Sequence, residues 1–138
     1  MKARVVAIMI MIWGALLILI PWTIFPVCGI GPNAAGTMAS IGYHGCQGTL
    51  RAETALGLIA LGLAAVPLLW PQRRPLLIAS LGGLLIALLA ILFPTVITGM
   101  CRVPTMPCRM GTLPALIIVS VLLGLCSAAG LALSRKLP

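Results

Sequence analysis

This sequence has almost no negative charge. Of its 138 residues one is acidic, Glu53, and only 7% carry a charge of either sign, whereas about a quarter of the residues are charged in a typical soluble domain. There is too little polar material to cover a surface in water, which excludes a soluble globular domain. With 62% hydrophobic residues and a mean hydropathy of +1.23, most of the chain is suited to lipid.

The chain also has few of the residues on which enzyme mechanisms depend. It has one histidine, His44, and one acid, and neither has an acid–base partner in the sequence. It contains no Walker A motif and no C-x-x-C pair of the kind that reactive thiol–disulfide enzymes use. We therefore expect a protein that is not an enzyme, with a membrane thiol–disulfide oxidoreductase as a minor alternative.

What the sequence does contain is four long apolar runs. A bilayer core about 30 Å thick needs roughly 20 helical residues, and a helix satisfies its own backbone polar groups in lipid. The runs cover residues 5–25, 53–70, 76–98 and 113–133. They predict an all-α integral membrane protein, a four-transmembrane-helix bundle made of two helical hairpins. The single membrane domain covers 1–138, with outer loops at 26–52 and 99–112.

The basic residues, which give a net charge of +8, lie at the ends of these runs. Four crossings place six of them on one side: Lys2, Arg4, Arg73, Arg74, Arg135 and Lys136. The positive-inside rule then places both termini in the cytoplasm. Topology explains these charges better than nucleic-acid binding does, so the expected partner is the lipid bilayer and not a nucleic acid.

The other side carries Arg51, Arg102 and Arg109 together with Glu53. We expect Glu53 to open the second span, where a helix N-terminus favours a carboxylate, or to pair with Arg102 or Arg109. On this placement no span interior contains an ionisable residue other than Cys126, a small apolar filler of span four. A proton or ion path through this chain alone is therefore not expected.

Four of the five cysteines fall in the two expected outer loops: Cys28, Cys46, Cys101 and Cys108. Disulfides persist in oxidising compartments, and they would restrain loops that have no core of their own. The simplest pairing joins Cys28 to Cys46 and Cys101 to Cys108, although four cysteines allow three pairings. Loop-closing disulfides are the leading interpretation of these residues.

A copper site is the alternative use of the same loops. Thiolate, thioether and imidazole groups are the ligands that select Cu(I). The candidate copper ligands are Cys101, Met106, Cys108, His44 and Cys46. No metal or other cofactor is favoured, because oxidised cysteines cannot bind metal and the spacing matches no closed zinc pattern.

Two further features concern packing and internal symmetry. Small residues recur at four-residue spacing, which lets helices approach closely: Ala60 and Ala64, Gly83 and Ala87, Gly124 and Ala128. Phe25-Pro26 and Phe93-Pro94 each precede a cysteine, which suggests a duplication of the hairpin. Pro67 and Pro94, near span ends, are expected to loosen or kink the last turn.

The loop motifs resemble those of an uncharacterised family of short prokaryotic four-span membrane proteins. That family shows a cysteine, then M-x-C-H-x-x-x-x-A-E at the start of span two, then P-T-x-x-x-G-x-C and M-x-C before span four. The matching residues are Cys28, Cys46, Ala52-Glu53, Pro94-Thr95, Gly99, Cys101, Met106 and Cys108. The chain departs from the family at His44, which replaces a methionine, and at Gln47, which replaces a histidine.

The resemblance implies a companion of ABC-type permeases and not an enzyme. We therefore predict a non-catalytic accessory subunit of a larger membrane complex, in the prokaryotic cytoplasmic membrane, with other membrane subunits as partners. The alternatives are an extracytoplasmic Cu(I)-binding membrane protein and a membrane thiol–disulfide oxidoreductase. The departures at His44 and Gln47 break the Met-Cys-His cluster on which a metal site in the first loop would depend.

Overall fold

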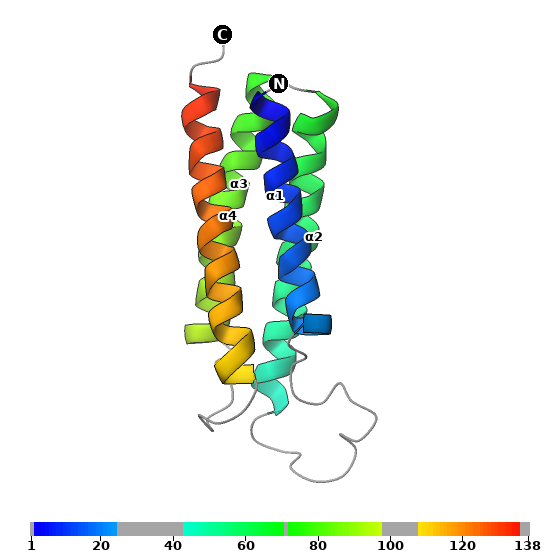
Figure 1. Ribbon diagram of the computed structural model, residues 1–138, viewed down its shortest axis with the longest axis vertical. Coiled ribbons are helices and arrows are strands. Elements are labelled where there is room, and N and C mark those ends of the chain that lie inside the picture. Colours follow the sequence, from blue (N-terminus) through cyan, green and yellow to red (C-terminus); the bar gives the residue numbers. More distant parts are fainter. Residues whose placement is uncertain (1, 25–42, 71, 98–107, 136–138) are drawn as a thin grey trace.

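The computed structural model is a bundle of long helices (Figure 1). It describes residues 2–24, 43–70, 72–97 and 108–135, and the side chains within 3–24, 48–70, 72–97 and 109–135. Its elements are α1 (Lys2–Leu19), η1 (Ile20–Ile24), α2 (Tyr43–Leu69), α3 (Arg73–Leu92), η2 (Phe93–Ile97), η3 (Cys108–Thr112) and α4 (Leu113–Ser134), where η marks a π-helical segment. The described residues form no β-strand.

Four helices are long and apolar enough to cross a membrane. The candidate spans are Ala3–Ile24, Gly48–Leu69, Arg73–Ile97 and Arg109–Ser134, each of 22 to 26 residues. This length matches the roughly 20 residues that a bilayer core requires. The prediction of an all-helical chain with four helices able to span a membrane is confirmed, and we treat the chain as a multi-pass membrane protein.

Helix α2 differs most from the expected boundaries. It begins at Tyr43, ten residues before the expected start of span two, and takes up part of the segment expected to be an outer loop. The glycine-containing run before Glu53 has the composition of a loop, but a helix can extend beyond the hydrocarbon core into the polar headgroup region. Glu53 therefore lies about three turns into the helix, and the expectation that it opens the helix is wrong.

Successive helices run alternately up and down the bundle (Figure 1). Each helix packs against two neighbours, in the order α1, α2, α3, α4 and back to α1, while α1 and α3 meet only slightly across the diagonal. Helix α1 begins and helix α4 ends at the same end of the bundle, together with the link between α2 and α3. We call this end the terminal end, and the other the opposite end.

The contact between α1 and α2 brings backbone against backbone. A Cβ atom added to Gly57 would lie 2.8 Å from the Gly14 carbonyl oxygen and 2.5 Å from Ile18 Cγ1, too close for either neighbour to stay in place. A Cβ atom on Gly14 would lie 3.0 Å from the Ala60 Cβ. Close packing of this kind drives helix association in lipid, so these small residues set the register of the first hairpin.

The contact between α3 and α4 pairs serine with glycine in both directions. A Cβ atom on Gly83 would clash with Ser127 Oγ, and one on Gly130 would clash with Ser80 Oγ. All four residues are buried. The two pairs lie about one turn apart on both helices, so they fix the antiparallel register of the second hairpin.

The expected small-residue pairs mostly lie in these interfaces. Buried members are Ala60, Ala64, Gly83 and Ala87. Gly124, on α4, faces α3, because a Cβ atom added to it would lie 3.5 Å from the Ala87 Cβ. Ala128 is exposed and takes no part in the contact, since a four-residue spacing alone does not fix which side of a helix faces inward.

Three of the prolines within the helical segments are fully buried: Pro21, Pro67 and Pro94. Pro21 and Pro94 each occupy the second position of a π-helical segment. The Thr23 and Thr95 hydroxyls donate to carbonyl oxygens four residues earlier, at 2.8 and 2.6 Å. The expected change in the last turn is confirmed at Pro94, whereas α2 continues past Pro67 to Leu69.

Candidate functional site

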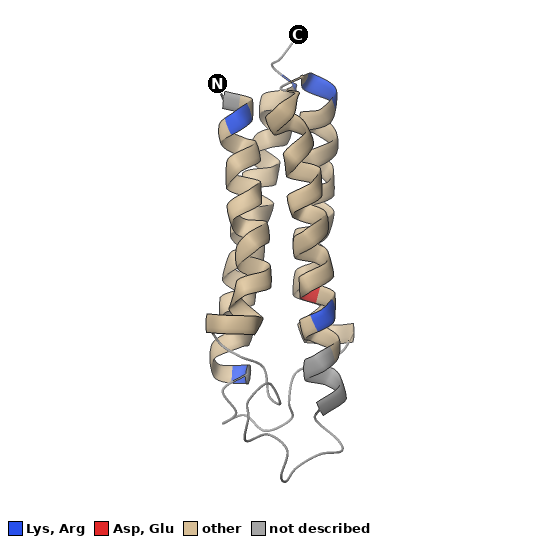
Figure 2. Ribbon diagram, turned by 90° about the vertical axis from the view of Figure 1, so that its right-hand side faces the viewer, with Lys and Arg blue, Asp and Glu red and all other residues tan. Residues whose placement is uncertain are grey.

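Basic residues gather toward the two ends of the bundle (Figure 2). Four exposed arginines lie at the terminal end: Arg4, Arg73, Arg74 and Arg135. Two more exposed arginines, Arg51 and Arg109, lie toward the opposite end. The described arginines therefore divide between the ends as the four-span topology requires.

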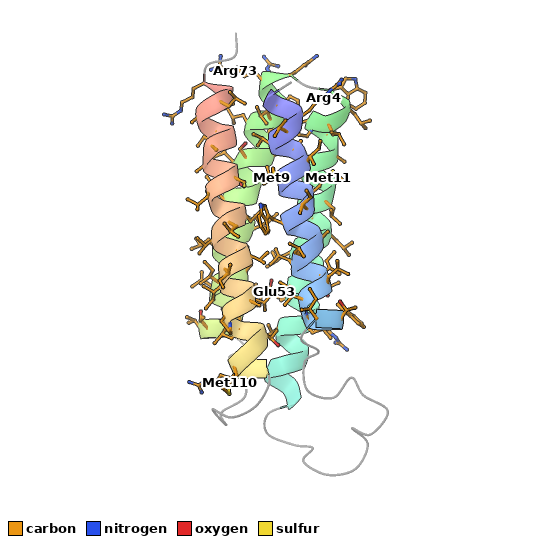
Figure 3. The ribbon with its side chains drawn as sticks, viewed as in Figure 1. Arg4, Met9, Met11, Glu53, Arg73 and Met110 are labelled. Carbon is orange, nitrogen blue, oxygen red and sulfur yellow. The ribbon has the colours of Figure 1, made fainter. Side chains whose placement is uncertain are left out.

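Glu53 departs from this arrangement, because it lies inside the bundle. Its side chain has no exposed surface and lies among the helices in the half nearer the opposite end (Figure 3). The register of the first hairpin shows which residue of the segment that continues α1 lies at the same height as Glu53. Gly14 faces Ala60, and two turns along α1 and two turns back along α2 lead to Pro21 and Glu53, because antiparallel helices advance together.

Neither carboxylate oxygen of Glu53 has a hydrogen-bond partner within the described residues. Arg51 and Arg109 are exposed, and the expected ion pair with Arg109 is not formed in this part of the chain. Arg102, the other expected partner, lies outside the described residues. Glu53 falls within the span Gly48–Leu69, so the expectation that no span interior contains a carboxylate is wrong.

Two prolines interrupt the regular α-helical hydrogen bonding of the segments that contact α2. Pro21 cannot donate to the Leu17 carbonyl one turn earlier, and Pro94 cannot donate to that of Ala90. The segments that contain these prolines, η1 and η2, both contact α2.

One hydrogen bond joins the two helices beside the carboxyl group. Trp22 Nε1 donates to Thr54 Oγ1 at 3.0 Å, and the Thr54 hydroxyl donates to the Leu50 carbonyl at 2.7 Å. These residues directly follow Pro21 and Glu53 in the sequence. Trp22 is half exposed, as tryptophans in the aromatic belt of a membrane interface are.

An ionised carboxylate that is buried without a partner costs several kcal/mol. Ionisable residues within membrane spans are rare for this reason, and they mark functional positions by default. The Glu53 carboxylate, on the part of α2 that η1 and η2 contact, presents acceptor oxygens without a partner among the described residues. It is suited to a positively charged group, and it is the candidate functional site of this chain.

The ligands expected from the sequence fall largely outside the described residues. Cys28, Cys101 and Met106 lie beyond them, and the side chains of His44, Cys46 and Cys108 are not among those described. The backbone places His44 and Cys46 in the first turns of α2 and Cys108 at the start of η3. The disulfides and the copper site stay predictions, and the described side chains bring together no group of three or more His, Cys, Asp or Glu. Cys126 is a partly buried free thiol in α4.

The burial of Glu53 was not predicted, yet the sequence holds a signal for it. Six of the buried positions of α2 recur at helical spacing: Thr49, Glu53, Leu56, Ala60, Ala64 and Pro67. Continued backward from the two alanines, that spacing reaches Glu53 and then Thr49. The apolar run predicts that span two begins at Glu53. The preceding turn, which contains Thr49, then belongs to the expected outer loop, so the inward face of the helix cannot be followed through Glu53 from the apolar run alone.

Comparison with protein families gives one result. The family model described as "Domain of unknown function (DUF4418)" matches residues 10–133, which includes the last three apolar runs and most of the first. Neither the curated proteins nor the solved structures give a match.

Proposed function

The chain belongs to the DUF4418 family, a family described as a domain of unknown function, and we propose that it acts as a non-catalytic accessory subunit of a larger membrane complex. In this role its outer surface packs against other membrane helices. An ABC-type permease is the partner that the motif resemblance favours. The subunit lies in the prokaryotic cytoplasmic membrane with both termini in the cytoplasm.

The closed interior of the bundle carries this proposal. The backbones of α1 and α2 meet at Gly14 and Gly57, and reciprocal serine–glycine contacts fill the space between α3 and α4. The core between the helices contains fully buried side chains such as Ile10, Leu17 and Leu123. A solute could pass between the helices only if these contacts separated, so a supporting role suits the bundle better than a transport path of its own.

The outer surface supports the same role. Small residues are exposed on two helices, Gly62 on α2 and Ala128, Ala129 and Ala132 on α4. A Cβ atom on Gly62 would meet nothing within 4 Å. Surfaces with small residues let another helix approach closely in lipid.

The exposed arginines of the terminal end support the proposed orientation. Single cysteines at Gln72 and Met110, both exposed, test it in a background without native cysteines. With an impermeant reagent added to intact cells, Met110→Cys should be labelled and Gln72→Cys should not. Labelling of Gln72→Cys from outside would reverse the orientation.

Purification in a mild detergent tests the accessory role. The wild-type chain should co-purify with a larger membrane protein in constant ratio. Gly62→Trp and Ala128→Trp change only exposed surface, so both should keep the melting temperature of the bundle, and at least one should abolish co-purification.

A chain that purifies alone would contradict the proposal. If such a chain carries near-stoichiometric copper under reducing conditions, and Met106→Leu loses that copper, the copper-binding alternative would replace the proposal. Met106→Leu nearly conserves volume and apolar character, so a loss of copper would report a lost ligand.

A further inference from the structure

The start of α3 forms a shallow groove at the terminal end. The groove is lined by Arg73, Arg74, Leu77 and Ile78, and Figure 3 shows Arg73 at this end. Residues four apart lie above one another on a helix, so Arg73 lies above Leu77 and Arg74 above Ile78. Both arginines are exposed, and Ile78 is 60% exposed. The groove therefore has a cationic rim and an apolar wall.

No acidic side chain of this chain can neutralise the rim. The single acid, Glu53, is buried toward the opposite end. Gln72, the N-cap residue of α3, makes no side-chain capping hydrogen bond. The first backbone N–H groups of the helix therefore add partial positive charge to the rim. The rim is therefore suited to an anionic group of another molecule.

The place of the groove in the membrane indicates which anion fits. Arg73 is the first residue of a span, so the groove lies where lipid headgroups meet acyl chains. The planar guanidinium group binds phosphate through paired hydrogen bonds, and an acyl chain would cover Leu77 and Ile78. A soluble anion would occupy the rim and leave the apolar wall exposed.

We propose that this groove binds an anionic phospholipid, with its phosphate on Arg73 and Arg74 and the upper part of an acyl chain against Leu77 and Ile78. The site is independent of the accessory role, because it needs no protein partner. Basic groups at the ends of membrane helices are known to hold anionic headgroups. The α3 groove joins such a rim to an apolar wall of one helical turn.

Native mass spectrometry of the full chain in detergent tests the proposal, with phosphatidylglycerol and phosphatidylcholine as probes. The wild type should bind phosphatidylglycerol at least about tenfold more tightly than phosphatidylcholine. Replacement of both arginines, Arg73→Gln with Arg74→Gln, should weaken phosphatidylglycerol binding about thirtyfold, because an arginine near an anionic lipid contributes about 1 kcal/mol.

The matched control removes the same charge from the opposite end. Arg51→Gln with Arg109→Gln alters two other exposed arginines and should leave the binding constant for phosphatidylglycerol unchanged. Equal weakening by the two double variants would overturn the proposal, because it would show that net charge alone attracts the lipid. All variants alter exposed side chains, and unchanged melting curves by circular dichroism should show that they are folded.

Two further measurements distinguish binding of a lipid from binding of a free anion. Ile78→Ser should weaken phosphatidylglycerol binding several-fold, because it makes the apolar wall polar, and millimolar inorganic phosphate should not displace the lipid. Displacement by phosphate together with unchanged binding in Ile78→Ser would overturn the lipid assignment. Equal affinity for phosphatidylcholine and phosphatidylglycerol would overturn it as well.

Discussion

The first hairpin, α1 with α2, and the second, α3 with α4, bury corresponding positions in the same order. Pro21 corresponds to Pro94, and at the sequence separation of these two residues nearly every buried residue of α1 has a buried counterpart in α3. Thr49 corresponds to Thr112, and at the sequence separation of these two residues nearly every buried residue of α2 has a buried counterpart in α4. The two prolines occupy the same place in η1 and η2, so the hairpins share local irregularities as well as helices.

This correspondence changes the repeat expected from the sequence. Phe25-Pro26 was expected to match Phe93-Pro94, but Phe25-Pro26 lies outside the described residues, and the structural counterpart of Pro94 is Pro21. Cys28 follows Pro21 by seven residues, and Cys101 follows Pro94 by seven as well. Aligning Pro21 with Pro94 therefore also aligns Cys28 with Cys101.

The hairpins differ most at the position of Glu53. Its counterpart in the second hairpin is Leu116, and both side chains have no exposed surface. A leucine therefore meets the packing needs of this position in one hairpin, and nothing in the shared fold demands a carboxyl group in the other. The packing of the shared fold therefore does not account for the carboxyl group of Glu53.

Gly57→Leu should have the largest effect, because it would break the contact that distinguishes the first hairpin. The new side chain would meet Ile18 and the Gly14 backbone, and such overpacking should lower the free energy of unfolding by about 3 kcal/mol. Gly62→Leu is the matched control on the same helix and, being exposed, should change it by less than about 1 kcal/mol. Titration with a denaturing detergent measures both, and similar losses in the two variants would contradict the close α1–α2 contact.

Glu53→Leu would give the first hairpin the residue that the second already has. It should raise the free energy of unfolding by about 1–3 kcal/mol, because it removes a buried polar group without a partner. Leu116→Glu, the reciprocal change, should lower it. Thermal unfolding in detergent measures both signs, and a lower stability of Glu53→Leu would show that the carboxyl group has a stabilising partner.

Gly83→Ala tests the contact between Gly83 and Ser127 in the second hairpin. The residues at the corresponding positions of the first hairpin are Ile10 and Ala64. The added methyl group would meet the Ser127 hydroxyl and should lower stability by about 1 kcal/mol. Adding Ser127→Gly should recover at least about 0.5 kcal/mol of this loss, because residues in contact are coupled. A double variant whose loss equals the sum of the single losses would show that the two residues do not interact.

Trp22→Phe should have the smallest effect, since it removes the one hydrogen bond from the indole to Thr54. Its counterpart in the second hairpin is Thr95, which bonds within its own helix. Hydrogen bonds between membrane helices average about 0.6 kcal/mol, and the free energy of unfolding should fall by about this amount. Trp70→Phe, at an exposed tryptophan, is the control and should leave stability unchanged.

Composition and apolar run length predicted the four helices correctly, because a long uncharged run has few other ways to satisfy its backbone in lipid. The charges at the helix ends likewise predicted that Arg4, Arg73 and Arg135 share one end. These features depend on properties that each segment has by itself. For the same reason they were visible without knowledge of the neighbouring helices.

The position of Glu53 and the π-helical segments could not be predicted in this way. Whether Glu53 faces lipid or the interior depends on the rotation of α2 about its axis, and the contact of Gly57 and Ala60 with Gly14 sets that rotation. Prolines predict an irregular turn but not its kind, as the different outcomes at Pro67 and Pro94 show. The loop ligands of the proposed copper site stay predictions from the sequence.

The closer packing within each hairpin than between hairpins bears on how the protein is assembled. Each hairpin is expected to enter the membrane and pair its own two helices first, with docking of the two hairpins as the later step. Residues 1–71 and 72–138, produced as two separate polypeptides in one cell, should therefore find each other and restore the bundle. Capture of one fragment through a tag on the other would measure this, and failure of two membrane-inserted fragments to associate would show that the link between α2 and α3 is required for assembly.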